Sequence, residues 1–180
     1  MSPYRPEFLA ALRLFARASE AMAARGLLRP ILVGGAAVEF YSGSAIMTGD
    51  FDVATPSQEE FEEELCALGF VRPSGAGRSL RGWVHPELAL GFEVVADVPM
   101  DGGYDRLTLA LVDIGGSSCA VLSIEDLIAD RMGQYASGTA RDRLDQAREL
   151  LRLHPDCDRA YLEQRVRAET MGDYGVGDIG

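Results

Sequence analysis

Two glycines and two aspartates, set a short distance apart, constrain the fold of this chain more than any other feature. Gly34-Gly35 follows the apolar run 31–33, and Asp50-Phe51-Asp52 begins a second strand-like run after Thr48. Strand side chains alternate, so both carboxylates face one way. Adjacent carboxylates repel unless a cation neutralises them, and Mg²⁺ takes oxygen ligands. An isolated Asp-x-Asp is also common at strand ends and in turns, so the prediction of a metal site rests on its combination with the glycines.

The glycine pair is the second half of this prediction. It stands between the apolar strand and an expected short helix over 36–41. A strand–Gly-Gly–helix turn exposes backbone N–H groups and a helix N-terminus, and both favour a polyphosphate. The sequence therefore predicts that phosphate binds at Gly34 and Gly35, near the metal ligands Asp50 and Asp52.

A third carboxylate is expected to complete the metal site. Glu93 lies inside the apolar run Phe92-Glu93-Val94, where an unpaired charge is costly, and Asp97 is the rival candidate. The two are about 13 Å apart along a regular strand, so only one of them can join the aspartate pair. Asp97 is close to Pro99, where the strand must end, which favours Glu93. The alternative for Glu93 is a solvated position on an edge strand.

The net charge and the choice of basic residues exclude several classes of function. The formal net charge is −11, and all 17 basic residues are arginine. The absence of lysine excludes a Walker-A phosphate loop and a Schiff-base mechanism. A surface this acidic repels nucleic-acid phosphates, so the sequence gives no strong indication of nucleic-acid binding. One basic window, Arg72 with Arg78 and Arg81, stands out; we expect Arg78 and Arg81 to contribute charge to a bound triphosphate.

The remaining pattern predicts an α+β (mixed α/β) chain. Strands are expected at 31–33, in the second half of 47–53, at 88–98 and at 107–114, and the expected helices are 6–25, 36–41, 57–68, 123–135, 139–153 and 158–170. We expect a core with an N-terminal helix over 1–121, a helical part of the same compact unit over 122–170, and a flexible tail over 171–180. No apolar run is long enough to span a bilayer, and a cytoplasmic protein is expected.

These motifs resemble the nucleotidyltransferase superfamily. Residues 31–53 resemble its opening motif, an apolar strand, Gly-Gly, a short helix and Thr-x-Asp-x-Asp, and Phe92-Glu93-Val94 resembles its later acidic strand. Residues 122–131, with the continuation at 143–147, resemble a helix start of minimal bacterial members such as AbiEii-type toxins. The resemblance implies the nucleotidyltransferase fold, in which a mixed sheet is flanked by helices and a helical C-terminal part closes a cleft.

The resemblance also implies a reaction. Asp50, Asp52 and Glu93 would hold two Mg²⁺ ions, with Gly34, Gly35 and Thr48 on the nucleotide side. A nucleoside monophosphate would pass from a nucleoside triphosphate, such as ATP, to an acceptor hydroxyl on a protein, an RNA or a small molecule. One alternative is a silent module that binds a protein partner, for instance a toxin–antitoxin component. A weaker one is another Mg²⁺-dependent phosphate enzyme that shares only Asp-x-Asp.

Overall fold

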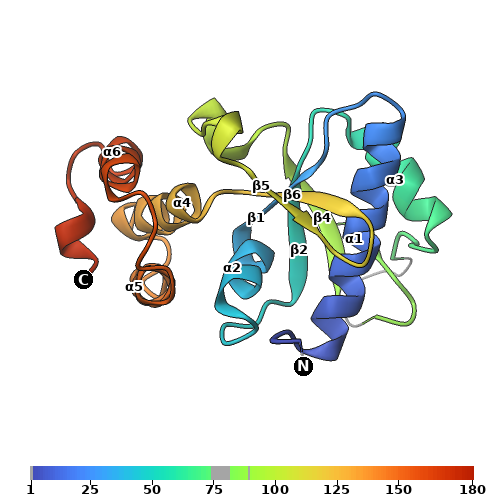
Figure 1. Ribbon diagram of the computed structural model, residues 1–180, viewed down its shortest axis with the longest axis horizontal. Helices are drawn as coiled ribbons and strands as arrows, with labels where there is room; N and C mark the ends of the chain where they lie inside the picture. The colour runs from blue at the N-terminus through green and yellow to red at the C-terminus, as the bar shows by residue number, and fades with distance from the viewer. Residues whose placement is uncertain (1, 74–81, 89) are drawn as a thin grey trace.

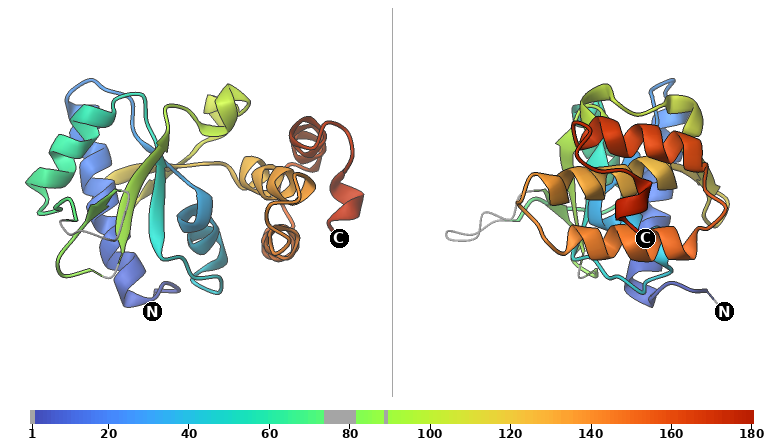
Figure 2. Two further views of the ribbon diagram at one scale, coloured as in Figure 1. Left: turned by 180° about the vertical axis from the view of Figure 1, so that it is seen from behind. Right: turned by 90° about the vertical axis from the view of Figure 1, so that its left-hand side faces the viewer.

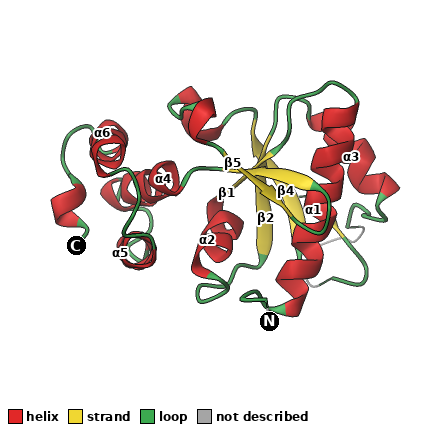
Figure 3. Cartoon of the chain, in the orientation of Figure 1, coloured by secondary structure: helices red, strands yellow, loops and turns green. Residues whose placement is uncertain are grey.

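One mixed sheet forms the centre of the molecule. The computed structural model describes residues 2–73, 82–88 and 90–180, and six strands of this part form a sheet in the order β3-β4-β2-β1-β6-β5. The strands are β1 (Ile31–Val33), β2 (Asp50–Ala54), β3 (Trp83–Val84), β4 (Gly91–Ala96), β5 (Ala110–Asp113) and β6 (Ser118–Val121). Pairs β1–β6 and β2–β4 are parallel, and β1–β2, β3–β4 and β5–β6 are antiparallel. The expected class, a mixed sheet flanked by helices, is confirmed (Figure 3).

The helices form three groups around this sheet. They are α1 (Pro6–Ala24), α2 (Gly34–Ser42), α3 (Gln58–Ala67), α4 (Ile124–Ala136), α5 (Arg143–Leu153) and α6 (Arg159–Glu169). Helices α1 and α3 cover one face and α2 lies on the other, while α4, α5 and α6 pack together beyond α2 (Figures 1 and 2). In the described part of the chain, no helix has the length and apolar character needed to cross a membrane.

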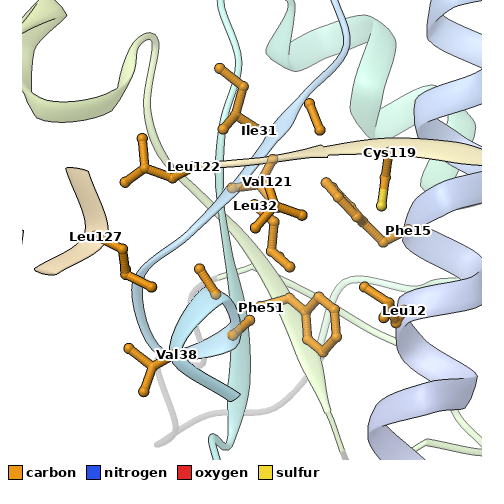
Figure 4. Close-up of a cluster of buried hydrophobic side chains, with 14 of the residues drawn as sticks. Leu12, Phe15, Ile31, Leu32, Val38, Phe51, Cys119, Val121, Leu122 and Leu127 are labelled. Carbon is orange, nitrogen blue, oxygen red and sulfur yellow. The ribbon is translucent and has the colours of Figure 1, made fainter. Parts of the chain in front are cut away.

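The core determines which way the site residues point. Phe51 of β2 stacks on Phe92 of β4 with ring centroids 4.7 Å apart, and Phe15 of α1 meets Phe92 edge-on at 6.2 Å. Figure 4 shows Leu12 and Phe15 packing toward Phe51 from α1. Because side chains alternate along a strand, the residues on either side of these phenylalanines face away from α1. They face the side of the sheet on which α2 lies.

Strand β6 is the largest departure from the sequence-based expectation. The sequence predicts one strand over 107–114 and helices thereafter. In the structure β5 starts at Ala110, after a short 3₁₀ helix at Arg106–Thr108, and a hairpin returns as β6 between β1 and β5. Gly115 and Gly116 make the turn with φ of 68° and 87°, the left-handed region that favours glycine.

The helical C-terminal part begins as expected. Ser123 caps α4, since its Oγ accepts a hydrogen bond from the Asp126 backbone N–H. Helix α5 starts at Arg143 rather than at 139. In the segment expected to be a flexible tail, residues Val176–Asp178 form a 3₁₀ helix and Ile179 is fully buried. Arg148 Nε donates to the Ile179 carbonyl at 3.0 Å, which attaches this end to α5.

Candidate active site

The aspartate pair begins strand β2. Asp50 is its first residue and is exposed, and Asp52 is half-buried two positions on. Phe51 between them is fully buried, so both carboxylates occupy the opposite face, as the alternation predicts. The Thr48 hydroxyl is 3.1 Å from the Asp50 carbonyl and 3.3 Å from its Oδ1, positions from which it donates to Asp50. Thr48 thus orients the first carboxylate.

The glycine pair lies against the second carboxylate. Gly34 and Gly35 form the first turn of α2, which therefore begins two residues before the expected Ala36. Gly34 has φ of 61°, and a Cβ there would overlap the Asp52 side chain. A Cβ on Gly35 would come within 2.6 Å of Thr48 Oγ1. Any larger residue would displace Asp52 or Thr48, so the glycines allow this close approach.

The charge of Asp52 is only partly compensated. Burial raises its pKa, and the neighbouring Asp50 and Glu93 carboxylates raise it further. A hydrogen bond from the Gly35 backbone N–H and the more distant Arg131 oppose this effect. The raised pKa means that a positive charge placed among these groups would be bound favourably.

Glu93 is in register with Asp52 across the sheet, whereas Asp97 lies beyond the end of β4. Asp52 is the register partner of Glu93 in the parallel β2–β4 pair, so their side chains leave the same face. Asp97 is exposed and follows the last residue of β4. Glu93 also borders a second hollow that is lined by Glu62, Arg72 and Trp83. Among the described residues, it is not one of those that line the cleft beside Asp50 and Asp52.

A cleft separates this edge of the sheet from the helical part. Its volume is about 570 Å³, and its sheet side is lined by Gly34, Gly35, Thr48, Asp50 and Asp52. Helices α4 and α5 supply the facing wall through Asp130, Arg131, Gln134, Arg143 and Gln146. An acidic wall thus faces a wall that carries two guanidinium groups.

The two arginines of the facing wall are held by neighbours. Arg131 is nearly buried and donates to Asp130 Oδ2, with Gln146 Oε1 at 3.5 Å. Arg143 donates from Nε to Gln134 Oε1 at 3.0 Å and from Nη1 to Asp142 at 2.7 Å. Such fixed, planar guanidinium groups suit phosphate oxygens.

The expected basic loop is only partly visible. Arg78 and Arg81 lie outside the described residues. Arg72, from the same window, pairs with Glu62 at 2.6 Å and lies over the Trp83 ring at 5.0 Å. The part of the triphosphate prediction that depends on Arg78 and Arg81 therefore stays a prediction.

The described residues contain no group of three or more histidine, cysteine, aspartate or glutamate side chains arranged to hold a metal ion by themselves. Asp50, Asp52 and Glu93 share a face and repel one another, but they are not gathered around one point. Their carboxylate oxygens still suit a hard cation such as Mg²⁺, because this ion commonly binds to one or two protein carboxylates and completes its coordination with water and substrate phosphates.

The resemblance implied that the helical part closes the cleft, but sequence reasoning assigned no site role to individual residues of α4 and α5. A helical signal was present, because Asp130, Arg131 and Gln134 lie within one turn of α4, and Arg143 and Gln146 share a side of α5. That spacing defines a polar face. It does not say that the face borders the aspartates, which depends on how the helices pack against the sheet.

Comparisons with known proteins support the fold. A nucleotidyltransferase-like antigenic protein from Paracoccidioides brasiliensis superposes with a TM-score of 0.59 at 16% identity, covering 94% of this chain and 90% of that one. ANT(2'')-Ia in complex with adenylyl-2''-tobramycin gives 0.57 at 16% identity, over 90% and 98% of the two chains. A solution structure of the antibiotic-resistance factor ANT(2'')-Ia gives 0.54, again at 16%, over 88% and 90%.

The fold is therefore that of nucleotidyltransferase-like proteins. No protein-family model matches the chain, and a search of curated proteins returns no significant match. At this identity the similarity establishes architecture, because many activities share one fold. What the chain does must be argued from its own cleft.

Proposed function

We propose that this protein is a metal-dependent nucleotidyltransferase that moves a nucleoside monophosphate from a nucleoside triphosphate to an acceptor hydroxyl. The observation that carries the proposal is the cleft in which the carboxylates Asp50 and Asp52 face Arg131 and Arg143. Glu93 is the register partner of Asp52 on β4 but is not among the described residues that line this cleft. Acidic groups suit divalent cations, and the guanidinium groups opposite them suit phosphate. A complex of a metal ion with a nucleoside triphosphate carries both a cation for the carboxylates and phosphate oxygens for the arginines.

Each group of the chain has a distinct role in this proposal. Asp50, Asp52 and Glu93 would hold Mg²⁺, in a two-ion site, and the bound ions would supply charge stabilisation at the reacting phosphate. Gly34 and Gly35 would offer backbone N–H groups to phosphate oxygens at the start of α2. The acceptor hydroxyl would attack the α-phosphorus, its proton would pass to a nearby base or water, and pyrophosphate would leave.

Positioning and charge would account for most of the effect of the site. Arg131 and Arg143, both anchored by hydrogen bonds, would neutralise the departing pyrophosphate. Arg78 and Arg81 are proposed to add charge on the triphosphate side. Ile46, Val95 and Pro99 give the cleft an apolar border suited to a base or to an acceptor ring.

The experiment is transfer of label from each of the four α-labelled nucleoside triphosphates, with Mg²⁺ or with EDTA. Acceptor pools of small hydroxyl compounds, RNA and protein are tested separately. We expect metal-dependent labelling of one pool, and its loss in Asp50→Asn and Asp52→Asn. Asp97→Asn is the matched control, because it removes an exposed carboxylate outside β4. No label and no triphosphate binding under any condition would contradict the proposal.

The second candidate is a catalytically silent member of the fold that binds a protein partner, such as a toxin–antitoxin component. It is favoured by the absence, within the described residues, of a ready-made three-ligand metal group. Such a module would bind its partner equally well with the aspartates replaced. Affinity that is unchanged in Asp52→Asn, without metal-dependent nucleotide binding, would identify it.

Finer assignments belong to the same proposal. The acceptor is first sought among small molecules, because one of the similar structures is bound to adenylyl-2''-tobramycin. Kinship with minimal AbiEii-like bacterial proteins and ATP as the donor are proposed on the sequence motifs. A cytoplasmic location is proposed because the sequence has no apolar run of the length that a bilayer requires. The division into a 1–121 core and a 122–170 helical part is proposed as well, because the two supply opposite walls of the cleft.

A further inference from the structure

A buried ion pair lies directly behind the loop that carries the first aspartate. Glu39 of α2 is fully buried, and Arg5, just before α1, reaches it with Nε at 2.6 Å and Nη2 at 3.1 Å from the two carboxylate oxygens. Neither residue is among those that line the cleft. The pair joins α2 to the start of α1. Glu39 lies in the short helix of the 31–53 motif, but the sequence analysis assigned no role to it or to Arg5.

The ion pair holds the Thr48 peptide from both sides. Glu39 Oε2 accepts the Thr48 backbone N–H at 2.6 Å, and Arg5 Nη2 donates to the Thr48 carbonyl at 2.6 Å. Ser44 closes the network, because its hydroxyl donates to Glu39 at 2.8 Å and accepts from the Arg5 backbone N–H at 3.0 Å. Both polar atoms of the Thr48 backbone are thus bonded to charged groups, which makes the bonds stronger than neutral ones.

The loop needs this support. Ser44 has φ of 63°, a left-handed conformation that costs free energy in a residue other than glycine. Gly49, which follows Thr48, is exposed, and a glycine can adopt more backbone conformations than other residues. Asp50 is exposed too, and its hydrogen bond within the described residues comes from the Thr48 hydroxyl. The position of the Asp50 carboxylate therefore depends on Thr48, and that of Thr48 on the ion pair.

We infer that Glu39 and Arg5 are positioning residues that hold the Thr48–Asp50 turn in the geometry that binds the metal. This inference rests on the proposed function and adds two residues to its machinery, neither of which touches substrate. Groups that orient metal ligands affect metal affinity by about 10- to 100-fold when they are removed. A purely structural ion pair would affect stability and leave metal affinity unchanged.

The test uses Mn²⁺ as the probe, with free Mn²⁺ measured by electron paramagnetic resonance on the full chain. Glu39→Gln keeps the side-chain shape but removes the charge that accepts four hydrogen bonds, and Arg5→Ala removes the other partner. The matched control is Asp126→Asn, which removes a fully buried carboxylate that Arg165 pairs at 2.7 Å, on α4 and away from the turn. All variants are measured well below their melting temperatures, with folding checked by circular dichroism.

We expect Glu39→Gln and Arg5→Ala to weaken Mn²⁺ binding by about tenfold or more, and Asp126→Asn to bind like the wild type although it is less stable. Hydrogen exchange should accelerate at the Thr48 amide in the first two variants only. Should Glu39→Gln fail to fold, Arg5→Ala decides, because the Arg5 side chain is partly exposed.

Three results separate the possible failures. Wild-type affinity in a folded Glu39→Gln or Arg5→Ala variant overturns the inference and leaves the proposed function intact. Equal weakening in Asp126→Asn also overturns it, because the effect would then be one of general stability. A wild-type protein that binds no Mn²⁺ overturns the proposed function itself, and the inference with it.

Discussion

At the scale of single residues, the pKa values of two acids on neighbouring elements, the buried Glu39 and the half-buried Asp52, are shifted in opposite directions. Burial alone would raise the pKa of Glu39, but hydrogen bonds from Arg5, Thr48 and Ser44 outweigh it and the pKa is lowered. Asp52 has the Gly35 N–H as its main hydrogen-bond donor, and its pKa is raised. The fold therefore compensates the Glu39 carboxylate, whereas Asp52 retains neighbouring negative charges that a cation would neutralise.

The first prediction follows from that uncompensated charge. Asp52→Asn should raise the melting temperature of the protein in EDTA, because it removes repulsion from Asp50 and Glu93 while the amide oxygen still accepts from Gly35. The gain should be about 2 to 4 °C for each kcal/mol of repulsion removed. Calorimetry at neutral pH measures it. Added Mg²⁺ should stabilise the wild type but not the variant, and a destabilised variant in EDTA would contradict the argument.

The second prediction separates the two candidates for the third carboxylate. Glu93 is in register with Asp52, and Asp97 is beyond the end of β4. Glu93→Gln should lower metal-dependent nucleotide affinity at least tenfold, whereas Asp97→Asn should leave it within about twofold. Titration calorimetry with a non-hydrolysable triphosphate and Mg²⁺ compares the two. The reverse pattern would place the functional end of the strand four residues later.

At the scale of elements, the sequence predicted helices and strands well where their signals were periodic. The helices expected over 6–25 and 123–135 are present as α1 and α4. Strand β6 was missed because Ser118–Val121 has four residues and no alternation: Cys119, Ala120 and Val121 are all buried between β1 and β5. A short run buried on both faces cannot be assigned by period alone. The turn Gly115-Gly116 was its visible signal.

The third prediction concerns the start of helix α2. Gly34→Ala combines a left-handed φ with a Cβ that overlaps Asp52. It should cost about 1 to 2 kcal/mol from the backbone alone and weaken metal binding by displacing the carboxylate. Gly177→Ala is the control, because a Cβ there meets nothing within 4 Å and its φ is ordinary. Chemical denaturation and Mn²⁺ titration measure both effects, and wild-type metal binding in Gly34→Ala would contradict the assignment.

The candidate site itself was predictable in part. Asp50, Asp52, Gly34 and Gly35 are close in sequence, and local rules placed them on a strand and a turn. The resemblance implied that the helical part closes the cleft, but the particular residues of the α4–α5 wall and the Arg5–Glu39 pair were not predictable, because they depend on helix packing across long sequence separations. Arg5 reaches Glu39 from a segment 34 positions away, and no periodicity links the two.

At the scale of the whole molecule, the helical part is attached to the core by more than its connecting chain. Asp126 of α4 is fully buried and accepts from Arg165 of α6 at 2.7 Å and from the Tyr161 hydroxyl at 3.0 Å. The Thr108 hydroxyl, from the segment before β5, is 3.4 Å away from it. This network joins the helices to the segment that leads into the sheet edge.

The fourth prediction is that the core and the helical part unfold together. The wild type should give one calorimetric transition whose calorimetric and van't Hoff enthalpies agree. Asp126→Asn leaves the buried Arg165 guanidinium without its main partner, and should cost about 3 to 5 kcal/mol and broaden or split the transition. Two transitions in the wild type would mean that the two parts are independent domains.

The strand order has a consequence for folding of the chain during its synthesis. Strand β2 lies between β1 and β4, and β1 pairs on its other side with β6, which is made much later. Such long-range pairings form slowly, because distant segments must first meet. A chain still emerging from the ribosome would therefore carry both aspartates without their third carboxylate, and later without the arginine wall. Under the proposed function, the cleft would be complete only when synthesis is nearly finished, and a truncated product would be inert.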